Sequence, residues 1–481
     1  MTWGRFVGIA LLLAPLRSPA ESVILPEPAP KPWLRWLGPL APQSGALPEV
    51  PSPLRDPGQV WTMEKALARA LQANADVQVA LAGVQRQDGL RLQTVSQLLP
   101  RIGVTANMDK RDPSLIDRTA FELSSPPTLR TAVSERSFDV RIDARQTLFD
   151  GLSGWNQVKR MALLKRKASV DARDLYLRTA SQVRQDYDAV IFREMVVGTR
   201  REAVRDLGHL ADVAQKRLAV GDISEYESLR AASALRSAEA DLAQAGSDLA
   251  RAQEALCRVL NIDKPAEGLR LTGAMTPLSY ADTFERALVR AQTGRPDLRS
   301  AELQLEAARL AQRAVTGGQL PRVEAYVDYV YRSSYYDYQR QLQGWTAGLV
   351  GRWNVFDSGQ TLGSSRTQRA ERRMAEIRVA EAKRLIGSQI RELFAGLDQA
   401  KTLMAAHQSA RDLGERSVRE ARRLYEVGRI SLEQVLNAEL GYRQSYVGWL
   451  GAVFTFNSTV YQLDYATANE AFLDAVAAAA R

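Results

Sequence analysis

Two aspartates in equivalent turns are the side chains of this sequence most able to do chemistry. Asp150 and Asp357 each follow a Phe that ends an alternating stretch, and a pair of carboxylates could serve as general acid and base. A turn or capping role explains both residues with fewer assumptions, because an aspartate side chain readily accepts hydrogen bonds from nearby backbone N–H groups. The sequence contains no Ser/His/Asp set, no phosphate-binding glycine loop and no metal-ligand spacing. We therefore predict that the protein is not an enzyme and has no cofactor.

The few other reactive side chains agree with this prediction. Cys257 is the single cysteine, which excludes an intrachain disulfide and a cysteine-based metal site. Its helical surroundings indicate a buried, inert thiol. His209 and His407 are the only histidines and lie at non-equivalent places. The net charge is +9, but Lys and Arg are scattered along the chain, so we expect no nucleic-acid partner.

The two ends of the chain differ from its middle. Residues 1–20 are typical of a signal peptide, with Arg5 before a short apolar core and small residues at the cleavage positions. Residues 21–58 form a proline-rich N-terminal extension, and residues 470–481 a C-terminal tail. No apolar run reaches about 18 residues, so the sequence predicts no transmembrane helix.

The middle of the chain is a duplicated unit, with repeat 1 at 59–265 and repeat 2 at 280–469. Two proline-free stretches, Trp155–Ala219 and Leu362–Glu426, align without a gap at a shift of 207 residues. As helices, each would span roughly 100 Å. No ordinary globular domain needs such a length, whereas an object that crosses a compartment does.

Before each long helix, the spacing of the apolar residues changes from a helical period to strict alternation. Helical spacing begins after the predicted cap Thr62, or after Thr283 in the second repeat, and continues without a break to Pro100 or Pro321. Apolar and polar residues then alternate, as in Phe138 to Arg145, which is typical of a half-buried strand or of a membrane β-barrel strand. A soluble hairpin packed on a helix is the alternative. The charged face, the nearby Tyr and Trp residues and the signal peptide favour the membrane.

Four such strands in one chain cannot form a closed barrel. An open sheet in lipid leaves unpaired backbone groups, each at a cost of several kcal/mol. Closed barrels need about eight strands or more, and about twelve begin to leave a lumen. We therefore expect an oligomer, and transport favours a trimer.

From Trp61 to about Asn469 the chain resembles the TolC-like outer membrane efflux proteins. The resemblance lies in the two Leu-Pro pairs that end at Pro100 and Pro321, the turns at Phe149 and Phe356, and the segment from Arg423 to Ser431. It implies an α + transmembrane β-barrel fold. In the implied homotrimer, three identical chains would each contribute four strands to a 12-stranded barrel in outer-membrane lipid. A long periplasmic α-helical barrel would continue from it.

The same resemblance implies the function. The family acts as a passive exit duct of tripartite efflux or type I secretion systems, in the outer membrane and extending into the periplasm. Its partners are a periplasmic adaptor, also called a membrane fusion protein, and an inner-membrane pump of the RND or ABC type. The alternative function is a periplasmic coiled-coil structural tether without a pore.

Three groups of site residues follow. The helix–strand transitions are Pro100, Pro321, Asp150, Gly151, Asp357 and Gly359. The periplasmic tips, which the family uses for adaptor docking, are Val220, Gly221, Ile223, Ser224, Val427, Gly428, Ile430 and Ser431. In these tips we expect left-handed glycines followed by serine caps. The resemblance places a gate at Glu227, Tyr425, Gln434 and Asn437.

The gate residues have different expected roles. In the family a tip tyrosine bonds to an acidic group on the first return helix, and Tyr425 and Glu227 occupy those places. Several members ring the mouth with aspartates, where this chain has the neutral Gln434 and Asn437. Cation block at the mouth is therefore not expected.

Overall fold

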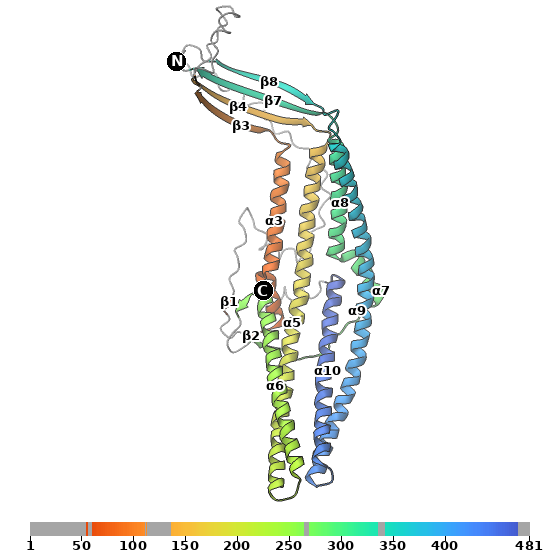
Figure 1. The fold of residues 1–481 in the computed structure, drawn as a ribbon. Coiled ribbons are helices and arrows are strands. Elements are labelled where there is room, and N and C mark those ends of the chain that lie inside the picture. The colour runs from red at the N-terminus through yellow and green to blue at the C-terminus, as the bar shows by residue number, and fades with distance from the viewer. Residues whose placement is uncertain are drawn as a thin grey trace, which may run out of the picture.

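The computed structural model describes residues 54–55, 60–110, 112, 136–263, 269–334 and 342–469. The predicted signal peptide, nearly all of the proline-rich extension, the interior of the loop between Lys110 and Arg136, and the C-terminal tail lie outside these residues. The described chain is elongated, with a sheet at one end and long helices that run from it to two hairpin tips (Figure 1).

The main elements follow the same order in both halves of the chain. The first half contains α2 (Met63–Ala73), α3 (Ala75–Ser96), β3 (Arg101–Lys110), β4 (Arg136–Phe149), α5 (Ser153–Ala219) and α6 (Glu225–Leu260). The second half contains α7 (Phe284–Gly294), α8 (Pro296–Gly317), β7 (Arg322–Ser334), β8 (Leu342–Arg352), α9 (Gln360–Glu426) and α10 (Leu432–Ala466). Two short parallel pairs add β1 (Leu54–Arg55) to β5 (Ile262–Asp263) and β2 (Val60–Trp61) to β6 (Arg270–Leu271).

The two long helices are confirmed, and the helices before the strands are corrected. Both α5 and α9 have 67 residues, so each spans about 100 Å. The helix predicted without a break from Thr62 to Pro100 is interrupted at Asn74, whose extended backbone lets its side chain accept the Asp76 N–H (3.0 Å). Its counterpart is interrupted at Arg295, because a residue before proline is driven out of the helical region. That part of the prediction was wrong.

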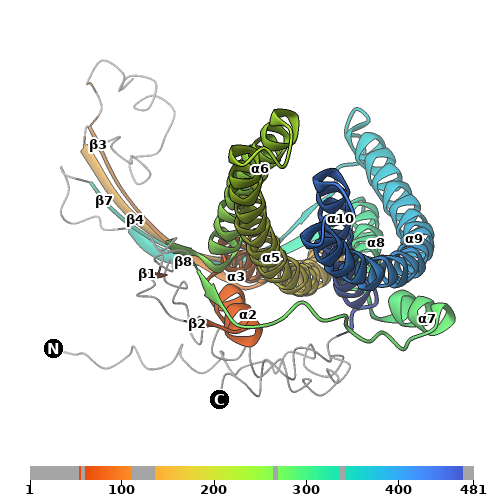
Figure 2. The ribbon, with the colours of Figure 1, turned by 90° about the horizontal axis from the view of Figure 1, so that it is seen from below.

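The helices stand in curved rows and do not surround a common core. In the lower half the neighbours are α6, α5, α10 and α9, and in the upper half α3, α5, α8 and α9. Figure 2 shows the curvature from below. The end members of a row, such as α6 and α9, make no substantial contact with each other. Each row is therefore a wall with two free ends.

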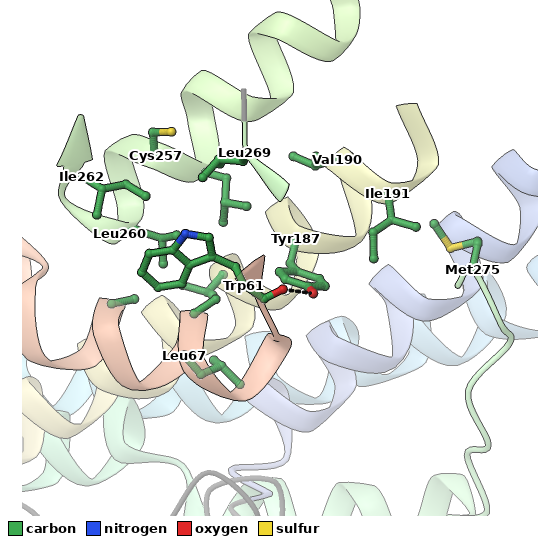
Figure 3. Close-up of a cluster of buried hydrophobic side chains, with 14 of the residues drawn as sticks. Trp61, Leu67, Tyr187, Val190, Ile191, Cys257, Leu260, Ile262, Leu269 and Met275 are labelled. Carbon is green, nitrogen blue, oxygen red and sulfur yellow. Dashed lines mark hydrogen bonds between the residues drawn. The ribbon is translucent and has the colours of Figure 1, made fainter. Parts of the chain in front are cut away.

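A buried cluster joins the N-terminal segment to the long helices (Figure 3). Trp61 and Leu260 are 3% and 0% exposed, and the Tyr187 hydroxyl donates to the Trp61 carbonyl at 2.9 Å. Cys257 is buried in the same cluster, as the sequence predicted. This packing fixes α2 and α6 against α5 at mid-height. None of the helices in the described ranges is both long and apolar enough to cross a membrane.

Candidate functional site

The four-stranded sheet has one predominantly apolar face. Its order is β3-β4-β7-β8, and all pairs are antiparallel. The register places Val104 opposite Ile142, Ile142 opposite Tyr329, and Tyr329 opposite Trp345. Directly opposed residues share a face. Val104 is 69% exposed and Trp345 is 75% exposed, so no described part of this chain covers the apolar face.

The opposite face of the sheet is charged. It carries ion pairs: Asp139 lies 3.5 Å from Arg332 on the neighbouring strand, and Arg145 lies 3.6 Å from Asp143 on the same strand. Gly348 leaves room for the Tyr326 ring, since a Cβ on this glycine would lie 2.8 Å from the tyrosine hydroxyl. A sheet with one charged and one uncovered apolar face requires water on one side and an apolar medium on the other.

The sheet is also unclosed. Strands β3 and β8 are its edges, and each is paired on one side only. The free N–H and C=O groups of an edge strand form a template for another strand. A single chain therefore leaves two strand edges unpaired and leaves the end helices of each row without a neighbour on one side.

The helix–strand transitions are tight turns built on the predicted residues. Asp150 accepts the Gly154 N–H at 2.6 Å, and Asp357 accepts the Thr361 N–H at 2.8 Å. Hydrogen bonds from Thr361 lower the pKa of Asp357. The turn role of both aspartates is confirmed. Pro100 and Pro321 stand directly before β3 and β7.

Gly151 shows why one of these turns needs glycine. Its φ is +67°, and an added Cβ would lie 1.9 Å from the Gly317 carbonyl oxygen. The equivalent turn contains Gly359, with φ of +92°. The close approach of Gly151 and Gly317 brings the end of α8 against the start of α5. The two strand–helix junctions are thereby held together.

The hairpin tips have the predicted turn geometry. Gly221 and Gly428 are left-handed, with φ of +79° and +72°. Ser224 accepts the Glu227 N–H at 3.3 Å, and Ser431 accepts the Gln434 N–H at 3.4 Å. Of the other predicted tip residues, Val220 and Val427 are exposed, whereas Ile223 and Ile430 pack against a buried cluster.

That buried cluster joins the two tips. Tyr425 of α9 is 7% exposed and packs with Ala214 of α5, Ala231 of α6, and Leu432 and Val435 of α10, so all four helices of the tips contribute. The Arg217 guanidinium lies 4.8 Å from the centre of the Tyr425 ring.

One expectation about the gate fails within the chain. The Tyr425 hydroxyl is buried and has no hydrogen-bond partner among the described residues, so the expected bond to Glu227 is not formed. The reason is packing, because the ring is turned into the apolar cluster. Gln434 and Asn437 both lie exposed on α10, and Gln434 also accepts the Ser431 N–H at 3.2 Å in a capping box.

A partly buried ion cluster above the tips was not predicted. Asp206 of α5 accepts from Arg422 of α9 at 2.8 Å and from Arg443 of α10 at 2.7 Å. Glu439 is only 3% exposed and lies between the two arginines. Burial acts to lower the pKa of Arg422, but hydrogen bonds to Asp206 and Glu439 hold it above its ordinary value.

This cluster links one hairpin to the other. Glu439 and Arg443 are four residues apart on one helix, a spacing that the sequence showed, but nothing local pointed to Asp206. Nearer the tip, Arg230 of α6 also pairs with Glu433 of α10 at 2.9 Å. Polar contacts and Tyr425 packing together hold the two hairpins side by side.

Comparisons with known proteins agree with this geometry. The family model described as outer membrane efflux protein matches residues 287–445. The Campylobacter jejuni CmeC outer membrane channel is 15% identical, with a TM-score of 0.75 over 84% of this chain and 85% of that chain. The outer membrane protein VceC from Vibrio cholerae is 14% identical, with a TM-score of 0.72 over 84% of this chain and 95% of that chain.

The open state of the Neisseria gonorrhoeae MtrE outer membrane channel is also similar. It is 16% identical, with a TM-score of 0.71 over 84% of this chain and 88% of that chain. No curated protein matches the sequence. At these identities the likeness to the solved structures is one of fold.

Proposed function

Because the chain belongs to the TolC-like outer membrane efflux proteins, we propose that three copies form a passive exit duct through the outer membrane that continues across the periplasm. The protein is a channel and not an enzyme. The observation that carries the proposal is the unclosed sheet with one charged and one uncovered apolar face.

The trimer follows from closing the sheet. Edge strand β3 of one copy pairs with edge strand β8 of the next, which satisfies the free backbone groups in lipid. Three chains with four strands each give a barrel of twelve strands, wide enough for a lumen. The apolar face lies against lipid and the charged face lines the pore.

The helices continue the same wall away from the membrane. We assign residues 59–265 and 280–469 as two repeats that each contribute two strands and one hairpin. At about 100 Å, α5 and α9 are long enough to cross much of the periplasm. The free ends of each helix row meet those of the neighbouring copies, as the free edges of the sheet do.

The tips are the periplasmic mouth, and they serve two purposes in this proposal. The exposed valines Val220 and Val427 and the glycine turns beside them dock a periplasmic adaptor. An inner-membrane pump of the RND or ABC type acts through that adaptor, for efflux or for type I secretion. The buried contacts between the hairpins keep the mouth narrow, with a low resting conductance, until the adaptor engages.

Matched lysine substitutions on the two faces of β8 test the proposal. Trp345→Lys with Leu349→Lys places charge on the apolar face, at about 2–4 kcal/mol per lysine near the bilayer midplane. Thr346→Lys with Val350→Lys places the same charge on the other face of the same strand. Purified proteins are added to planar bilayers and the current is recorded.

We expect stepwise channel currents from the native protein and the Thr346/Val350 variant, and none from the Trp345/Leu349 variant. A folded native protein that never conducts would instead support a periplasmic tether without a pore. Equal behaviour of the two variants would contradict the assignment of faces.

A further inference from the structure

Basic side chains gather on the helices immediately beneath the sheet. Four segments at the sheet end of the helices (86–96, 153–170, 307–317 and 360–370) hold eleven lysines and arginines and a single acid, Asp88. The following residues of α5, 171–188, hold four acids and three bases. These segments are far apart in sequence, but α3, α5, α8 and α9 stand side by side below the strands (Figure 1). We call these four segments together the basic collar.

A groove that lies partly within the collar is formed between α8 and α9. Its volume is about 730 Å³, and three guanidinium groups line it, from Arg309, Arg313 and Arg372. Arg309 and Arg313 are exposed, four residues apart on α8, and have no carboxylate partner among the described residues. Arg372 is ion-paired with Glu376 at 3.4 Å, and the Oε1 of Gln312 accepts its Nη1–H at 3.2 Å. The groove is therefore lined by two arginines without a carboxylate partner in the described chain and by one that is ion-paired and held in place.

The rim of the groove has membrane-interface character. Trp353 follows β8, is 61% exposed, and donates its Nε1–H to the carbonyl of Gln319 at 3.1 Å. Gln319 and the half-exposed Leu320 line the groove. Tryptophan is enriched where a protein passes from hydrocarbon to headgroups. The groove is thus lined by cationic side chains and has apolar side chains next to it where α8 leads into the sheet.

We infer that this groove binds the phosphate headgroup of an anionic phospholipid in the periplasmic leaflet of the outer membrane. The inference rests on the proposed function, which places the sheet in that membrane and the helix tops at its headgroups. One guanidinium group can donate two parallel hydrogen bonds to two oxygens of a phosphate. Basic pockets at a membrane face bind anionic headgroups. The acyl chains pass Leu320 toward the apolar face of the sheet.

Lipid retention tests the inference. The full-length protein is reconstituted in vesicles of phosphatidylethanolamine and phosphatidylglycerol in equal amounts, extracted, and its bound lipids are counted by native mass spectrometry. The test variant is Arg309→Gln with Arg313→Gln. The control is Arg201→Gln with Arg205→Gln, another exposed pair four residues apart on α5 without a carboxylate partner in the described chain.

We expect the native protein and the control to retain phosphatidylglycerol in preference to phosphatidylethanolamine. The groove variant should lose about fivefold in retention per arginine removed. A large excess of inorganic phosphate in the wash should leave the lipid bound, because its acyl chains also hold it.

Three results would overturn the inference. These are equal retention of the two lipids by the native protein, equal loss in both double variants, and displacement of the lipid by inorganic phosphate, which would indicate a site for soluble anions. Flotation of the protein with the vesicles separates the two proposals. A protein that floats without lipid preference refutes only the lipid site, whereas one that does not float refutes the proposed function and the site that rests on it.

Discussion

Arg443 of α10 donates to the carboxylate of Asp206 on α5 at 2.7 Å, across the interface between the two helical hairpins. The same carboxylate accepts from Arg422 of α9. One aspartate of the first hairpin therefore holds two arginines of the second. Hydrogen bonds of this charge-assisted kind contribute about 1.5–3 kcal/mol each. We expect this contact to resist separation of the hairpins at the mouth.

The first prediction concerns Asp206→Ala. The substitution removes a partner from two arginines at once, so the hairpins should separate more readily and the resting conductance in planar bilayers should rise. Asp241→Ala is the control, since Asp241 pairs with Arg200 at 3.0 Å within one hairpin. An equal rise in both variants, or no rise with Asp206→Ala, would remove the cluster from the closing mechanism.

The second prediction concerns Tyr425→Phe. Its hydroxyl is buried without a partner in the chain, so its removal should leave conductance unchanged and should not lower stability, because an unsatisfied polar group is lost. Tyr425→Ala should destabilise the tip by about 3–5 kcal/mol through the cavity it leaves. Thermal unfolding and bilayer recordings measure both effects. Raised conductance in Tyr425→Phe alone would mean that the hydroxyl bonds to a neighbouring chain.

The sequence predicted those structural features that depend on neighbouring residues in the chain, such as long helices and the two faces of a strand. Alternation specified the faces of β4, and the proline-free stretches specified α5 and α9. The extended residue at Arg295 could have been predicted from Pro296. The environment of Tyr425 could not, because Ala214 and Ala231 reach it only through tertiary packing.

The ion cluster shows the same limit. Asp206 and Arg422 are separated by 216 residues, and no local pattern relates them. Only the packing of α5 against α10 brings these side chains together. The glycine–serine pattern of the tips correctly predicted left-handed turns at Gly221 and Gly428, but it did not specify the polar contacts between the hairpins.

The third prediction concerns the mouth. Gln434 and Asn437 are exposed one turn apart on α10, and three chains would bring six such residues around the pore. Gln434→Asp with Asn437→Asp should create a carboxylate ring that binds divalent and trivalent cations. Single-channel current should then fall when such cations are added on the periplasmic side. If the native channel is blocked in the same way, these residues do not line the mouth.

The fourth prediction concerns Gly428→Ala. Gly428 has φ of +72°, and a left-handed non-glycine residue costs about 1–2 kcal/mol. Adaptor binding, measured by pull-down of the adaptor from crosslinked membranes, should fall while the protein stays in the membrane. Gly441→Ala is the control, because Gly441 is helical with open space at its Cβ. Normal adaptor binding by Gly428→Ala would show that the shape of this tip is not needed for docking.

Closure of the sheet by neighbouring copies is the central claim, and disulfide crosslinking between edge strands tests it most directly. Thr105→Cys on β3 is combined in turn with Gly344→Cys, Thr346→Cys or Val350→Cys on β8, all on the charged face. Ala347→Cys, on the other face, is the control, and the native Cys257 is buried. After oxidation in intact membranes, we predict that at least one charged-face combination gives a ladder of products that ends at three chains. A ladder that ends at two chains or continues past three, or no crosslink from any combination, would contradict the trimeric duct.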